Sequence, residues 1–164
     1  MMISRSLLAI TFGAILFVGC DSNDNNDDGP PNRVTITEVV INEFPDRNEG
    51  ERWDGGVIPS NADVYFLLRN ADNDNVLIDT DGDNFQDVEI GDAPLAWDTD
   101  YRTTDFRRPL YIELYDEDPT NEDDFMGDTE DFNLGEAADD NFRRTMTVTG
   151  DGISILLRLE WDRR

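Results

Sequence analysis

The stretch PLYIELYD, residues 109–116, has the pattern of a β-strand with one buried face. Leu110, Ile112 and Leu114 recur at every second position, and successive side chains of a strand point to opposite faces of a sheet. Pro109 and Asp116 bound the run. Strict alternation over so few residues indicates a half-buried strand, because a helix repeats its apolar face every three to four residues.

Short apolar runs of the same kind extend along most of the chain, separated by Asp, Asn, Gly and Pro. No sustained helical period interrupts them, and only residues 138–141 allow a single helical turn. Eight or nine short strands at this spacing predict an antiparallel sandwich or barrel. The further runs are 34–42, 63–70, 75–79, 85–90, 94–101, 125–134, 143–150 and 153–161.

The first 19 residues have the layout of a secretory signal. Arg5 precedes a twelve-residue apolar run at 7–18, which is too short to span a bilayer stably. Gly19 and Cys20 follow, and the sequence FVGC resembles the lipobox of bacterial lipoproteins, with Phe17 in a place that usually holds Leu. That resemblance implies that Cys20 is acylated and becomes the first residue of the mature chain. A plain signal peptide with an incidental Cys is the alternative.

The residues after Cys20 read DSNDNNDDGPPN and contain no apolar side chain to bury except two adjacent prolines. We therefore expect three parts: a signal peptide at 1–19, a lipidated Cys with a disordered acidic tether at 20–32, and one folded domain at 33–164. The lipidated Cys implies a protein anchored in the cell envelope. The acidic run after it resembles a surface-export signal, whereas Asp21 directly after the Cys resembles an inner-membrane retention signal. We expect the outer membrane or cell surface rather than the inner membrane. Cys20 is the single cysteine of the chain.

The charge of the chain excludes several functions. Its formal net charge is −25, from 38 acidic and 13 basic residues, and it contains no His. Every basic residue is Arg. A surface this negative excludes nucleic acid as a partner, since phosphate binding requires cationic side chains. Cations are the natural partners. The same composition resembles that of proteins from salt-loving microbes, in which acidic residues keep the surface solvated. Carboxylate spacing is therefore more informative than carboxylate number.

The sequence LYDEDPTNEDDFMG at 114–127 places six carboxylates after the strand that ends near Asp116. Asp54 and Asp63 flank a second loop, and loops at one pole of a sandwich converge. Calcium takes six to eight hard oxygen ligands, which two Asp-bearing loops with carbonyl groups between them supply. We expect the side chains of Glu117, Glu122 and Asp123 to be ordinary solvated charges.

The same stretch resembles the third calcium loop of C2 domains, in which a strand ends in Asp, Asp follows after two and eight positions, and two apolar residues and Gly come next. WDGGVIPSNADVYF at 53–66 resembles the first calcium loop, although it is longer and Val64 replaces the usual Pro. PLAWDTDY at 94–101 and the closing strand at 153–161 add weaker matches. The resemblance implies an all-β, eight-stranded antiparallel β-sandwich. It implies calcium ligands at Asp54, Asp63, Asp116, Asp118 and Asp124.

Further residues are implied by the same resemblance. Asp46 is an alternative to Asp54, Asn121 would lie near a second ion, and the carbonyl groups of Trp53, Glu117 and Glu122 would complete the shell. We expect Trp53 to pack beneath its loop rather than to insert into lipid. The function that this indicates is a calcium-binding, lipid-anchored binding or structural module with an unidentified protein, glycan or lipid-headgroup partner.

Other interpretations compete with this one. DTDGDNFQD at 79–87 resembles an EF-hand loop, but Asn84 and Ile90 stand where that loop requires Gly and Glu, so a polar hairpin turn is favoured. Paired carboxylates also occur in glycosidases, but pairs are inevitable among so many acids, and the absence of His excludes a Ser-His triad. We expect no enzyme. The remaining alternative is an acidic scaffold without specific calcium binding.

Overall fold

The computed structural model describes residues 29–46, 50, 53, 61–118 and 122–163. Within these ranges the chain forms nine β-strands, two 3-10 turns and one short helix. They are β1 (Arg33–Glu43), β2 (Ala62–Asn70), β3 (Val76–Asp79), η1 (Asp81–Asp83), β4 (Phe85–Val88), η2 (Ile90–Asp92), β5 (Leu95–Thr103), β6 (Leu110–Asp116), β7 (Asp124–Asp128), α1 (Gly135–Asp139), β8 (Thr145–Gly150) and β9 (Ile153–Asp162). Every run of apolar residues that predicted a strand overlaps one.

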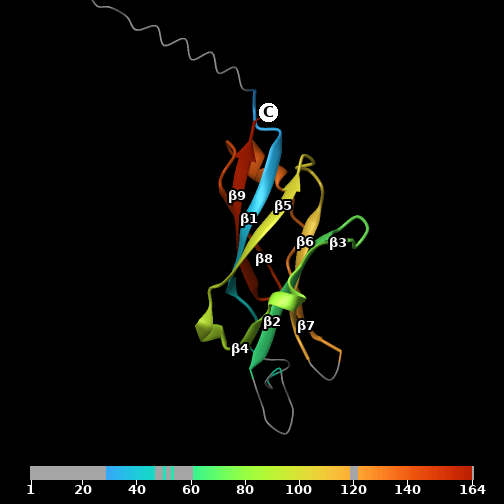
Figure 1. The fold of residues 1–164 in the computed structure, drawn as a ribbon, viewed down its shortest axis with the longest axis vertical. Coiled ribbons are helices and arrows are strands. Elements are labelled where there is room, and N and C mark those ends of the chain that lie inside the picture. The colour runs from blue at the N-terminus through green and yellow to red at the C-terminus, as the bar shows by residue number, and fades with distance from the viewer. Residues whose placement is uncertain (1–28, 47–49, 51–52, 54–60, 119–121, 164) are drawn as a thin grey trace, which may run out of the picture.

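The strands form two antiparallel sheets that face each other (Figure 1). One sheet has the order β5-β1-β9-β8, and the other has the order β3-β2-β6-β7, with β4 also paired to β2. The predicted antiparallel β-sandwich is confirmed, with nine strands rather than eight in the described ranges. Asp151 and Gly152 both have positive φ, of 38° and 79°, in the tight turn between β8 and β9, as expected of a two-residue hairpin turn.

The core lies between the two sheets and is organised by the alternation of β6. Leu110, Ile112 and Leu114 are at most 1% exposed, whereas the residues between them are partly exposed. Phe66 of the same sheet makes an edge-to-face contact with Trp97 of the opposite sheet, with ring centroids 5.3 Å apart. Burial of these side chains holds the layers together, since fully burying one large apolar side chain stabilises a fold by about 1.5–3 kcal/mol.

The segment between β3 and β4 is arranged differently from the predicted hairpin. Both strands pair antiparallel with β2: β3 pairs with residues 67–69 and β4 with residues 62–64. They therefore follow one another along the same edge of β2, and η1 joins them. The hairpin prediction was wrong because the polar residues at 80–84 turn the chain locally without reversing the direction of the strand.

Helical structure is limited to short segments in the part of the chain that the structure describes. The predicted helical turn at 138–141 corresponds to α1, which begins three residues earlier and buries Gly135 and Ala137. None of the helices in those ranges has the length and apolar character required to cross a membrane.

The chain that follows β7 closes the side of the sandwich formed by β7 and β8. The Glu130 amide donates to the Thr149 carbonyl at 2.9 Å, and the Thr129 amide donates to the Ile112 carbonyl at 2.9 Å. One short segment thus bonds to both sheets. Gly150 lies under it, and a Cβ atom at this position would be 2.6 Å from the Asp128 carbonyl oxygen and 2.6 Å from the Glu130 nitrogen.

We predict that Gly150→Ala destabilises the fold by about 1–3 kcal/mol, because the added methyl group overlaps backbone atoms that have no rotamer freedom. Thermal unfolding followed by circular dichroism measures the effect. Gly91→Ala is the matched control, since nothing lies within 4 Å of a Cβ atom there. Equal melting temperatures for the two variants would contradict the close packing at Gly150.

Candidate functional site

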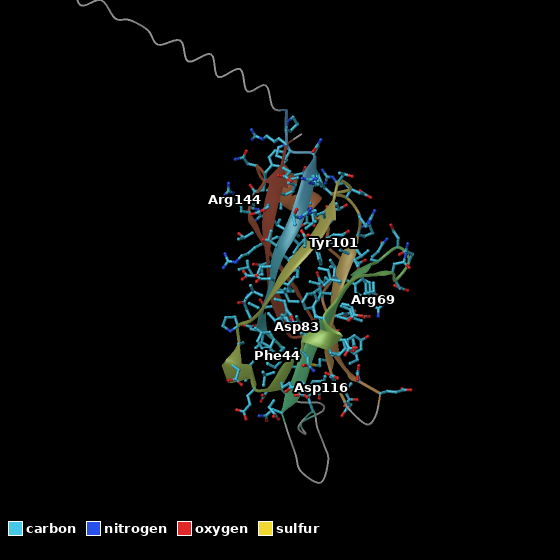
Figure 2. All side chains as sticks on the ribbon, in the orientation of Figure 1. Phe44, Arg69, Asp83, Tyr101, Asp116 and Arg144 are labelled. Atoms are coloured by element: carbon cyan, nitrogen blue, oxygen red, sulfur yellow. The ribbon has the colours of Figure 1, made fainter. Side chains whose placement is uncertain are left out.

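The ends of β2, β6 and β7 bring three of the predicted ligands to one pole of the molecule. Asp116 at the end of β6 pairs with Val64 on one side and with Asp124 on the other. The Asp63 amide donates to Asp116 Oδ1 at 2.6 Å, and the Glu117 amide donates to the Asp63 carbonyl at 2.9 Å. Figure 2 shows Asp116 at the end of the molecule opposite Arg144.

Asp116 is the most buried acidic residue of this pole, with 0% of its surface exposed. Side chains of a strand alternate between its two faces, so Asp116 points to the core like Leu110, Ile112 and Leu114 before it. A carboxylate away from water must be stabilised by hydrogen-bond donors or by cations. The Asp63 amide supplies one donor. A hard cation such as calcium would also suit this position, because such cations prefer carboxylate oxygen atoms as ligands.

The side chain of Asp63 also contacts the neighbouring strand. Its Oδ1 accepts a hydrogen bond from the Asp87 amide at 2.7 Å, which joins β2 to the β4 edge. Asp63 lies next to the core-facing Val64, so the strand alternation directs its side chain to the outer face of the sheet. The Asp63 side chain, predicted as a calcium ligand, thus also helps to hold β4 against β2.

Asp123 organises the acidic loop, although the sequence predicted an ordinary solvated charge there. Its Oδ1 accepts from the Asp118 amide at 3.2 Å, and its Oδ2 accepts from the Tyr65 hydroxyl at 2.7 Å. Burial and this hydrogen bond raise the pKa of Tyr65, so the hydroxyl remains a donor. The Tyr65 and Tyr115 rings stack with centroids 5.4 Å apart. The local sequence around Asp123 could not predict this role, because the hydrogen bond from the Tyr65 hydroxyl depends on the position of β2.

The other candidate residues of the two loops differ in their surroundings. The Glu117 side chain accepts a hydrogen bond from Asn84, which follows η1, whereas Glu122 is exposed. Trp53 is buried, at 8% exposure, and its Nε1 donates to the Pro45 carbonyl at 2.8 Å. The prediction that Trp53 is buried is confirmed, and Trp53 belongs to the hydrophobic core. Asp46 is exposed. Cys20, Asp54 and Asn121 lie outside the described residues.

The described carboxylates do not by themselves form a complete metal site. Among residues 29–46, 50, 53, 61–118 and 122–163, no three acidic or cysteine side chains lie close enough to hold a metal ion. This applies equally to the EF-hand-like stretch at 79–87, where the Asp81 amide donates to Asp79 Oδ1 at 3.1 Å. Asp54 and Asn121, which the sequence also predicted as ligands or near an ion, lie outside these ranges.

A second acidic contact lies beside the pole, and the sequence did not predict it. Asp128 of β7 forms a side-chain hydrogen bond with Asp151, in the turn between β8 and β9. Burial raises the pKa of Asp128, and the negative charge of Asp151 and this hydrogen bond raise it further. Burial and a neighbouring negative charge both disfavour the ionised form of a carboxyl group. The two residues are far apart in sequence, so only the fold brings them together.

No family model matches the chain, and no curated protein matches it. Among solved structures, the chain is similar to the calcium-bound tandem C2 domains of extended synaptotagmin 2, with a TM-score of 0.47 and 21% identity over 80% of this chain and 46% of that one. A second structure of these tandem domains matches with a TM-score of 0.46 and 20% identity over 98% of this chain and 49% of that one. A structure of the SMP domain of the same protein together with both C2 domains matches with a TM-score of 0.44 and 22% identity over 80% of this chain and 27% of that one. The chain spans less than half the length of each of these solved structures.

We predict that Asp128→Asn stabilises the protein at neutral pH. Because the pKa of Asp128 is higher in the folded chain than in the unfolded chain, stability decreases as the pH rises through the interval between the two values. Asn is neutral at every pH and removes this loss. The melting temperature of the variant should exceed that of the parent at pH 7, and the difference should disappear at acidic pH.

Melting temperatures measured across a pH series test this prediction. Asp131→Asn removes one charge from an exposed position on the next segment and serves as the control. If the difference in melting temperature between Asp128→Asn and the parent stays constant with pH, protonation of Asp128 does not contribute to stability, and the prediction is wrong.

Proposed function

We propose that this chain is a calcium-binding, C2-like β-sandwich that a lipid on Cys20 anchors to a bacterial cell envelope, at the outer membrane or cell surface. Its role in this proposal is that of a binding or structural module without catalytic activity. The observation that supports the calcium proposal is the placement of Asp63, Asp116 and Asp124 at the adjoining ends of the neighbouring strands β2, β6 and β7.

The arrangement of this pole supports a cation as its ligand. The Asp116 carboxylate is removed from water, and Asp124 lies directly across from it on β7. Like charges on directly opposed residues of a sheet destabilise the pair unless a positive charge lies between them. Asp54, Asp63, Asp116, Asp118 and Asp124 would hold the ion. When bound, calcium would neutralise their repulsion and fix the shape of both loops.

A fixed loop pair is a surface on which a partner can dock. The ordering of loops before an encounter lowers the entropic cost of binding, so calcium would control affinity without any chemical step. A protein, a glycan and a lipid headgroup are the partner classes consistent with this role. The proposed lipid on Cys20 would hold the domain at the membrane independently of calcium.

We predict that calcium raises the melting temperature of the full chain. A ligand at 100 times its Kd stabilises the folded state by about 2.7 kcal/mol, which corresponds to a shift of several degrees. Asp116→Asn combined with Asp118→Asn should abolish most of the shift and most of the heat in isothermal titration. The matched control is Asp72→Asn combined with Asp131→Asn, which removes the same charge from exposed positions elsewhere.

Two results would contradict the calcium proposal. One is the absence of heat and of a melting shift at millimolar calcium. The other is equal stabilisation by sodium chloride at matched ionic strength, which is the behaviour of an acidic scaffold adapted to high salt.

We predict that Cys20→Ser releases the protein from the membrane. The sulfur of Cys20 is the only thiol in the chain, so the variant has no alternative site for a thioether-linked lipid. Mass spectrometry of the mature N-terminus and detergent phase partition of the two proteins measure the effect. An unmodified thiol in the parent protein would overturn the anchor while leaving the calcium proposal intact.

A further inference from the structure

The two sides of the sandwich differ in how their sheet edges are covered. At β7 and β8, the segment after β7 forms backbone hydrogen bonds with both sheets. At the opposite side, β3 with β4 forms one edge and β5 forms the other. Within the described part of the chain, no backbone hydrogen bond joins β5 to β3. One side of the sandwich is therefore closed and the other is open.

The open edge of β5 is long. β5 has nine residues and pairs with β1 along one edge, and no other described strand pairs with it. A sheet edge presents unpaired N–H and C=O groups to any extended chain that approaches it. Such an edge is the surface on which strand addition occurs.

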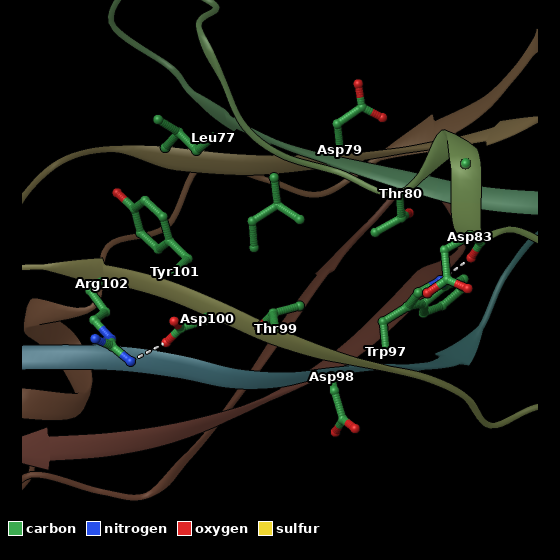
Figure 3. Close-up of a pocket in the computed structure, with 12 residues that line it drawn as sticks. Leu77, Asp79, Thr80, Asp83, Trp97, Asp98, Thr99, Asp100, Tyr101 and Arg102 are labelled. Atoms are coloured by element: carbon green, nitrogen blue, oxygen red, sulfur yellow. Dashed lines mark hydrogen bonds and ion pairs between the residues drawn. The ribbon is translucent and has the colours of Figure 1, made fainter.

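A cleft of about 530 Å³ lies between β3 and β5 (Figure 3). Leu77 and Ile78 line one wall, and Thr99 and Tyr101 line the other. At one end, Trp97 Nε1 donates to the Asp83 carbonyl at 2.7 Å and holds η1 against β5. The Tyr101 hydroxyl is buried and has no hydrogen-bond partner among the described residues. The cleft thus combines apolar and polar lining side chains with an open strand edge.

The charge of the cleft is strongly negative. Asp79, Asp83, Asp98 and Asp100 line it, whereas the only basic lining residue is Arg102, which forms an ion pair with Asp100 at 2.7 Å. Asp98 and Asp100 are exposed on β5 itself. A segment that enters the cleft with positive side chains would therefore be attracted to it.

The same features oppose pairing between two copies of this chain. A second β5 would bring its own acidic side chains to the edge, and each chain has a net charge of −25. The register of β5 with β1 also shifts between Ile36 and Glu38, which marks a bulge in this edge. Exposed charges and bulges are the devices by which edge strands avoid self-association.

We propose that the cleft between β3 and β5 binds an extended, positively charged segment of another protein, which adds as a strand to the free edge of β5. Alternate side chains of this segment would face in opposite directions. One row, of apolar residues, would enter the cleft against Leu77, Ile78 and Tyr101. The other row, of basic residues, would lie beside Asp98 and Asp100. This proposal does not depend on calcium or on the lipid.

A synthetic nine-residue peptide of alternating Val and Arg is the probe, and the full chain is the target. Fluorescence anisotropy measures the affinity, and hydrogen–deuterium exchange locates the peptide. We expect saturable binding with slower exchange of β5 amides. An analogue that is N-methylated at alternate residues keeps its charge but cannot form the strand hydrogen bonds, and it should not bind.

Asp98→Asn combined with Asp100→Asn tests the charge of the cleft. Because exposed ion pairs contribute about 0.2–1 kcal/mol each, the affinity should fall by roughly two- to thirtyfold. Asp131→Asn combined with Glu136→Gln makes the same change in net charge at exposed positions, one before α1 and one within it, and is the control. The control should bind the peptide as the parent does.

Three outcomes would overturn the proposal. The first is no saturable binding of the Val-Arg peptide. The second is equal affinity for the N-methylated analogue, which would show charge attraction without strand addition. The third is concentration-dependent dimerisation of the chain alone in sedimentation experiments, with protected β5 amides, which would identify a second copy as the occupant.

Discussion

The burial of one face of β6 is the constraint on which the rest of the structure depends. β6 lies between β2 and β7, and its core-facing row runs through Leu110, Ile112 and Leu114 to Asp116. Asp116 follows Leu114 by two residues and therefore faces the core as well, so the row ends in a carboxylate with no exposed surface. The Asp63 amide donates to that carboxylate at 2.6 Å. The same contact therefore stabilises the charge and aligns the ends of β2 and β6.

Hydrogen bonds from backbone amides to carboxylates stabilise the negative charges of this acidic pole. Asp116 accepts from the Asp63 amide, Asp63 from the Asp87 amide and Asp123 from the Asp118 amide. Hydrogen bonds to an ionised acceptor are roughly twice as strong as neutral ones. The loop ends are thus held in place before any ion binds, which limits the ordering that a calcium ion would have to impose.

The pole and the open cleft share one structural element. η1 lies between them: Asn84 at its end bonds to the Glu117 side chain of the pole, and the Asp83 carbonyl accepts from Trp97 at the end of the cleft. Because β3 and β4 run in series along β2, η1 is placed over the end of β5 rather than at the tip of a hairpin. η1 therefore contacts both the pole and one end of the cleft.

The strands themselves were predictable from the sequence, because alternation and turn residues are local signals. The runs around Leu110, Ile112 and Leu114 and the turn at Asp151 and Gly152 needed no knowledge of their neighbours. That Asp63, Asp116 and Asp124 lie at one pole was predictable as well, since antiparallel strands end at shared poles. Among the described residues, however, no three acidic side chains lie close enough to hold a metal ion. The bonds of Asp123 were not, because Tyr65 lies on a different strand and no periodicity relates the two residues.

The sequence by itself determined the strand segments and the negative charge, since composition and period-two alternation act along the chain. Only the tertiary structure decided which carboxylates bond to backbone amides, that β3 and β4 follow one another on a single edge, and that the β5 edge stays open while the β8 edge is covered. These features depend on register and on cross-strand neighbours, which are contacts between residues distant in sequence.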